Sequence, residues 1–247
     1  MPTPHKLITA LALAAAGLAG APATATVLVD DFNSGAASFV NAGLVESSAA
    51  QAGTMVGGAR FDGLLCYFAC DYNAPYQAAL EVGNGTLTVT PPAAGLATTR
   101  VLWGEVIANG NGFPFAPLGL SLAGHGAFAL QFGAVSADLL VQFVVVSAAG
   151  QSVYSPVPNN PGVVLHAAAA QTLTLPFSAF VGVADFGQIN GLALVLGGNN
   201  GHGTEAAMAS FALDSVVATA VPEPAASVLL VAGLAGLAAL AVSRRRR

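Results

Sequence analysis

The strongest constraint on the fold is a series of short apolar runs that show no helical period. Gly, Asn and Pro separate the runs, and those at 85–91 and 171–177 alternate Thr with Leu or Val. That alternation is typical of a strand with one buried and one solvent-facing side. Because the runs recur at intervals of roughly ten residues, they favour an antiparallel β-sandwich or barrel. We predict strands at 26–32, 85–91, 99–107, 127–132, 138–146, 171–177, 191–197 and 208–217, and short helices or loops at the Ala-rich stretches 47–53 and 166–170.

The placement of charges divides the chain into a central domain and two flanking segments. Of the seven Lys and Arg residues, Lys6 lies near the N-terminus and four form the C-terminal cluster Arg244, Arg245, Arg246 and Arg247. Between residues 26 and 220, Arg60 and Arg100 stand against eleven carboxylates, a formal net charge of −9. A domain this poor in cations has no basic face for nucleic acid, so we exclude nucleic acid as a partner.

The first 25 residues have the order of parts found in a secretory signal peptide. Lys6 supplies the positive region, residues 7–18 are apolar, and Ala23 and Ala25 flank a small-residue cleavage site. The apolar run is short for a membrane span, which needs about 20 residues. We therefore predict cleavage by signal peptidase after Ala25 and export of the domain at 26–220.

The C-terminal segment, 221–247, carries a membrane-length apolar run. Residues 225–242 contain Ser227 as their one polar member, and as a helix they would span roughly 27 Å, close to the thickness of a bilayer core. The Arg cluster follows at once and favours a cytoplasmic end. The sequence predicts one transmembrane helix, with the domain held outside the inner membrane and facing the periplasm.

Val221, Pro222, Glu223 and Pro224 precede that run, and the two prolines favour an exposed, extended backbone. The order Pro-Glu-Pro, apolar helix and Arg cluster resembles the PEP-CTERM sorting signal of Gram-negative bacteria. The resemblance implies that an exosortase recognises the tripeptide, cleaves there, and passes the protein to the cell surface or extracellular matrix. A permanent single-span anchor is the alternative.

Several central segments resemble jelly-roll, galactose-binding-like domains. They are VDDFNSG (29–35), MVGGARFDGLL (55–65), VLWGEVI (101–107), LTLPFSAFVGVADFGQINGLALVLGG (173–198) and FALDSVV (211–217). The resemblance implies a jelly-roll-type sandwich in which the first and last strands pair. It departs from the common pattern at VLWGE, where an Asp-Gly often follows the Trp.

Two hypotheses concern small structural sites. Cys66 and Cys70, the two cysteines of the chain, are predicted to form a disulfide, because export leads to an oxidising compartment. Asp30, Asp31 and Asp214 offer oxygen ligands for a structural calcium ion, provided that the first and last strands pair. The alternative is that these acids cap turns and face solvent.

A patch of aromatic and polar residues follows the first cysteine. Tyr67, Tyr72 and Tyr76 lie there among Asp, Asn and Gln, a mixture suited to sugar rings and hydroxyls. Trp103 and Tyr154 are further aromatic candidates, although a Trp inside a strand is more often part of the core. The patch predicts a carbohydrate-binding surface.

No nucleophile elbow, zinc-protease helix or phosphate-binding loop occurs in the sequence. We therefore predict a non-enzymatic surface or matrix protein, structural or interacting with exopolysaccharide, without a required cofactor. The alternative is an extracellular hydrolase of matrix glycans, which would need two carboxylates converging in one groove.

Overall fold

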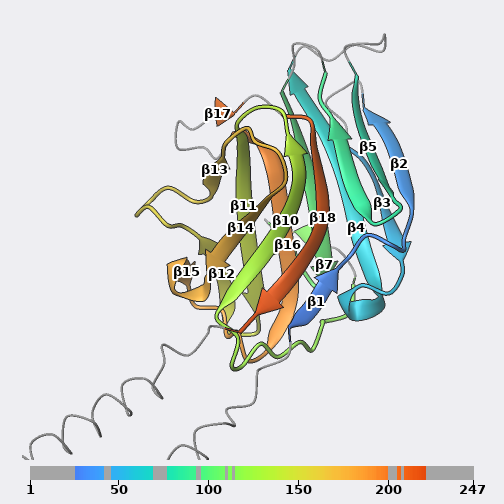
Figure 1. The fold of residues 1–247 in the computed structure, drawn as a ribbon. Coiled ribbons are helices and arrows are strands. Elements are labelled where there is room, and N and C mark those ends of the chain that lie inside the picture. Colours follow the sequence, from blue (N-terminus) through green and yellow to red (C-terminus); the bar gives the residue numbers. More distant parts are fainter. Residues whose placement is uncertain are drawn as a thin grey trace, which may run out of the picture. The chain divides into compact units, whose positions relative to one another are not determined.

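The computed structural model describes residues 26–41, 46–68, 77–92, 96–108, 111–112, 115–199, 205–206 and 209–220. The predicted signal peptide (1–25) and the predicted sorting segment (221–247) lie outside these residues. Within the described part, no helix is long and apolar enough to cross a bilayer. The residues from Thr26 to Thr219 form one compact unit, and Figure 1 shows its strands packed as two layers.

The first layer, sheet A, is antiparallel throughout. Its order is β14 (Gln171–Pro176), β10 (Ala127–Val135), β18 (Phe211–Thr219), β6 (Thr86–Thr90), β5 (Ala78–Gly83) and β2 (Ala37–Asn41), and β1 (Val27–Asp30) also pairs with β18.

The second layer, sheet B, is also antiparallel. Its order is β15 (Phe180–Gly182), β12 (Gly150–Tyr154), β11 (Leu139–Ser147), β16 (Ile189–Asn199), β7 (Leu96–Gly104), β4 (Ala59–Phe68) and β3 (Ser47–Ala52). Two short strands extend this sheet: β13 (Val163–Leu165) pairs with β11, and β17 (Glu205–Ala206) pairs with β16. A separate two-stranded ladder joins β8 (Ile107–Ala108) to β9 (Asn111–Gly112). The segments η1 (Val56–Gly58) and η2 (Phe177–Ala179) are single 3-10 turns. The prediction of an all-β antiparallel sandwich is confirmed.

The first and last strands pair, as predicted. In the register of β1 and β18, Val27 lies opposite Ala218 and Leu28 opposite Val217. β18 has β10 on one side and shares its other side between β6 and β1. The N-terminal strand is therefore held in the middle of sheet A.

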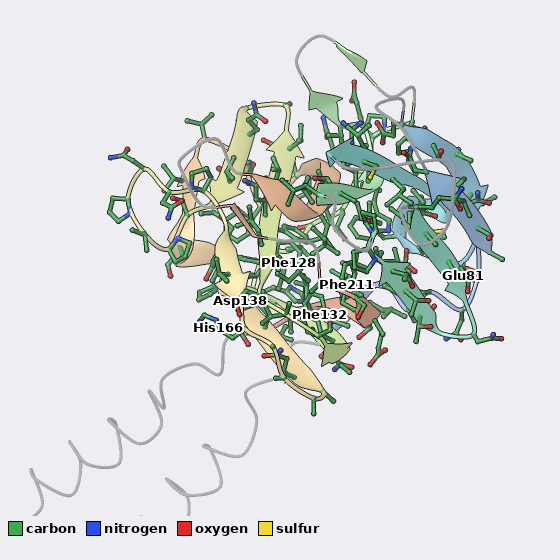
Figure 2. All side chains as sticks on the ribbon, turned by 90° about the horizontal axis from the view of Figure 1, so that it is seen from above. Glu81, Phe128, Phe132, Asp138, His166 and Phe211 are labelled. Carbon is green, nitrogen blue, oxygen red and sulfur yellow. The ribbon has the colours of Figure 1, made fainter. Side chains whose placement is uncertain are left out.

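The hydrophobic core lies between the two sheets, because alternate side chains of each strand point inward. The rings of Phe128 on β10 and Phe143 on β11 meet across the sheets with centroids 4.6 Å apart, and both are fully buried. Figure 2 shows Phe128, Phe132 and Phe211 in the interior. All eight predicted strand regions contain a strand of the structure.

The prediction for the Ala-rich stretch at 47–53 is wrong. Residues 47–52 form β3, which pairs with β4 along its whole length, from Ser47 opposite Leu64 to Ala52 opposite Ala59. Ala has low intrinsic strand propensity, but at this sheet edge the pairing with β4 decides the conformation. The stretch 166–170 is a loop, the other predicted possibility, with one isolated bridge from Ala168 to Val135.

Candidate functional site

The predicted tyrosine patch falls largely outside the described residues. Tyr67 lies at the end of β4, but its side chain is not described, and Tyr72 and Tyr76 lie in 69–76, outside the described part. Cys66 is fully buried and disulfide-bonded, while Cys70 lies outside. The other two aromatic candidates, Trp103 and Tyr154, are buried in the core.

The predicted calcium set is not assembled. In the described part of the chain, no group of three or more His, Cys, Asp or Glu side chains is placed to hold a metal ion. Asp31 instead accepts a hydrogen bond from the Asn33 backbone N–H at 3.1 Å, as an acid that caps a turn does. A side-chain hydrogen bond from Asn33, together with this backbone bond, lowers the pKa of Asp31. Asp30 has another partner altogether.

Asp30 belongs to a buried ionic network with Arg60, Asp62 and Trp103. The Arg60 guanidinium donates from Nη1 to Asp30 Oδ2 and from Nε to Asp62 Oδ1, each at 2.7 Å. The Trp103 indole N–H donates to the same Asp30 oxygen at 2.8 Å. All four side chains are at most 1% exposed. Of the predicted calcium ligands, Asp30 is thus engaged by an arginine.

The network joins the two sheets. Asp30 ends β1 of sheet A, whereas Arg60 and Trp103 lie opposite each other on β4 and β7 of sheet B. Arg60 also donates to the Gly35 carbonyl at 2.8 Å, and its guanidinium carbon lies 5.0 Å from the centre of the Phe32 ring. Phe32 has φ +54, and its N–H donates to Asp30 Oδ1 at 2.8 Å. The network therefore fixes the left-handed backbone that follows β1.

Of the two carboxylates in the network, Asp62 accepts fewer hydrogen bonds than Asp30. Its Oδ2 has no hydrogen-bond partner within the described part. Burial raises the pKa of Asp62 to about 6, against the opposing effect of the Arg60 charge. Burial alone would lower the pKa of Arg60, but the charges of Asp62 and Asp30 raise it. The arrangement is inaccessible to solvent, so we assign it a structural role.

An open groove of about 490 Å³ lies over sheet A at β2, β5 and β6. Ser38, Glu81 and Thr88 form one cross-strand row on this face, since Ser38 lies opposite Glu81 and Glu81 opposite Thr88. All three are exposed. The groove is lined by Ala36, Ala37, Ser38, Glu81, Val82, Gly83, Asn84, Thr86 and Thr88.

Gly83 leaves open space in this lining. It lies on the same face of β5 as Glu81, because side chains two residues apart point the same way, and Thr86 is its cross-strand partner. A Cβ built on Gly83 would meet no heavy atom within 4 Å. A ligand can therefore approach the backbone here.

A two-residue turn formed by Asn84 and Gly85 lies at one end of the groove. Asn84 and Gly85 both have positive φ, +54 and +80, and connect Gly83 directly to Thr86. Positive φ at both central residues defines the two-residue hairpin turn that Asn-Gly favours. This turn places Asn84 in the groove lining together with Thr86 and Thr88.

The chemistry of the groove is that of a hydrogen-bonding surface. Hydroxyls, one amide and one carboxylate face solvent, while Leu80 and Val82 of the same strand are buried in the core. Figure 2 shows Glu81 at the periphery, away from the interior rings and on the opposite side from Asp138 and His166. Sequence reasoning missed this site, although the alternation of Thr with apolar residues at 85–91 did indicate the exposed face of β6.

Comparison with known proteins finds no family. No protein-family model matches the chain, and no significant match exists among curated proteins. Several solved structures show weak structural similarity to it. One is the family 11 carbohydrate-binding module of the cellulosomal cellulase Lic26A-Cel5E of Clostridium thermocellum, at 11% identity and a TM-score of 0.39, over 81% of this chain and 96% of that one.

Two further structures concern modules of the same family. The module from Clostridium thermocellum in complex with a β-1,3-1,4-mixed-linked tetrasaccharide has 11% identity and a TM-score of 0.39, over 79% of this chain and 96% of that one. The solution structure of CtCBM11 has 11% identity and a TM-score of 0.41, over 83% and 100%. Overlap at this level assigns neither a family nor a ligand to this chain.

Proposed function

We propose that this chain is an exported, non-enzymatic surface or matrix protein whose jelly-roll-type sandwich binds polysaccharide in the groove over Gly83. The observation that carries the proposal is the open space at Gly83 among exposed hydroxyl, amide and carboxylate groups. Sugar hydroxyls need such donors and acceptors, and a side-chain-free position lets a ring lie against the sheet. Tyr67, Tyr72 and Tyr76, which follow Cys66 in the sequence, remain a second candidate surface.

The groove favours binding over hydrolysis. Glycosidases commonly use two carboxylates about 5 to 10 Å apart on either side of the scissile bond. Among the described residues, Glu81 is the one carboxylate in the lining, and the Asp30 and Asp62 carboxylates are buried in the core. We therefore propose no catalytic residue.

Filling the groove should abolish binding without unfolding the protein. In Gly83→Leu the new side chain enters open space at a φ suited to any residue, so stability should change by less than about 0.5 kcal/mol. We expect the affinity of the full-length protein, purified in detergent, for polysaccharide of the producing organism to fall at least tenfold. Surface-immobilised polysaccharide and biolayer interferometry would measure this.

Thr174→Leu is the matched control, since Thr174 is an exposed residue of β14, at the far edge of the same sheet. Equal affinity of wild type and Gly83→Leu would remove the groove from the proposal. A selective loss in Tyr72→Ala would move the site to the tyrosine patch, and no binding by the wild type would end the polysaccharide proposal.

Export and sorting rest on the sequence, and we propose that an exosortase processes the chain at Pro222-Glu223-Pro224. Glu223→Ala should then leave the protein in the membrane fraction, while the wild type reaches the cell surface or the medium. Cell fractionation and immunoblotting of both variants would measure this. Identical processing and release of the two variants would show that the tripeptide is not read.

A further inference from the structure

We propose that the groove selects a polysaccharide that carries free amino groups, that is, a de-N-acetylated hexosamine polymer. This inference rests on the proposed function and adds the class of sugar. It follows from where the few cations of the domain lie and from the position of Glu81 in the groove.

Both arginines of the central domain are already paired. Arg60 is fully buried between Asp30 and Asp62. Arg100 is paired with Glu46 on the outer face of sheet B, with Nε 3.2 Å from Glu46 Oε1. The domain at 26–220 contains no Lys. Its arginines therefore offer no unpaired cation to a ligand.

Most of the described carboxylates, by contrast, lack an arginine partner and are exposed or partly exposed. Six described acids form no ion pair with Lys or Arg, and one of them, Asp138, has His166 Nδ1 at 3.1 Å. The six are Asp31, Glu81, Glu105, Asp138, Asp185 and Asp214. A surface of one sign attracts a polymer of the opposite sign and repels one of its own. Anionic polysaccharide is therefore disfavoured.

Of these six acids, Glu81 is the one that lines the groove. Its carboxylate stands on the same face as the open position at Gly83, in a row with the Ser38 and Thr88 hydroxyls. A sugar ring lying over Gly83 would place one substituent near Glu81 and others near the Thr86 and Thr88 hydroxyls. An ammonium group at that substituent forms a charge-assisted hydrogen bond, which is stronger than the neutral bond of an acetamide or hydroxyl.

The test compares three soluble oligosaccharide probes of equal length on the full-length protein in detergent: glucosamine oligomers, their N-acetylated counterparts and oligoglucuronate. We expect the glucosamine oligomers to bind most tightly, and more weakly in 0.5 M than in 0.05 M salt. Glu81→Gln should weaken glucosamine binding about fivefold, the factor that corresponds to about 1 kcal/mol for one exposed ion pair. It should leave binding of the N-acetylated probe unchanged.

Asp138→Asn is the control for a general charge effect, because Asp138 is exposed and lies on the opposite side of the domain from Glu81 (Figure 2). Equal losses in Glu81→Gln and Asp138→Asn would overturn the inference, as would tighter binding of the N-acetylated or anionic probe. If either result were found but Gly83→Leu still abolished binding, polysaccharide binding in the groove would remain supported. Absence of binding to every probe and to native polysaccharide would remove both.

Discussion

Arg60→Met should destabilise the domain by about 3 to 5 kcal/mol, the range measured when one partner of a buried ion pair is removed. The variant leaves Asp30 and Asp62 buried without a counter-charge and removes the donor to the Gly35 carbonyl. A loss of this size is a third or more of the stability of many domains. Trp103, the single Trp of the chain, is itself in the network, so its fluorescence during urea unfolding reports the change directly.

Arg100→Met is the natural comparison, because Arg100 is the other arginine of the domain. Its ion pair with Glu46 is partly exposed, and such pairs contribute about 0 to 1 kcal/mol. If Arg60→Met proves too unstable to purify, the double variant Arg60→Met with Asp62→Asn should recover part of the loss, since one stranded charge is gone. Equal effects of the Arg60 and Arg100 substitutions would contradict the assigned role of the network.

Lowering the pH from 7 to 4.5 should stabilise the wild-type domain relative to Asp62→Asn by about 2 kcal/mol. The pKa of Asp62 is raised to about 6 in the folded protein, from 3.8 as its ordinary value. The folded state therefore binds the proton more tightly than the unfolded state, and the stabilisation grows as pH falls through 6. Above pH 7 both states are ionised and the contribution vanishes.

Urea unfolding of both proteins at several pH values would measure this difference. Subtracting the Asp62→Asn curve removes the contribution of every other titrating group, including the histidines. Parallel curves for the two proteins between pH 4.5 and 7 would show that Asp62 does not titrate in this range. An opposite slope would show that the Arg60 charge outweighs the burial of the carboxylate.

The alternation of Thr with apolar residues identified β6 and β14 from the sequence. β6 and its Asn84-Gly85 turn are local features, and local patterns identify them. β4 has the reverse pattern, because the polar residues Arg60 and Asp62 point inward while Phe61 lies on the outer side. A buried ionic network cannot be recognised from alternation, since its partner Asp30 is 30 residues away.

The groove could not be predicted from local sequence patterns either. It depends on the register that sets Ser38 beside Glu81 and Glu81 beside Thr88, and on the absence of a side chain at Gly83. Composition did indicate one of its properties, since the shortage of Lys and Arg already implied a domain of negative charge. The position of Glu81 in the groove could be known only from the fold.

Amide chemical-shift mapping would show whether polysaccharide binds over Gly83. The ¹⁵N-labelled full-length protein in detergent micelles would be titrated with the oligosaccharide that it binds most tightly. We predict that the largest shifts cluster at Ser38, at Glu81 to Gly85, and at Thr86 and Thr88. Saturable binding that leaves these amides unmoved and shifts others, such as those of β14 or of the segment after Cys66, would contradict it.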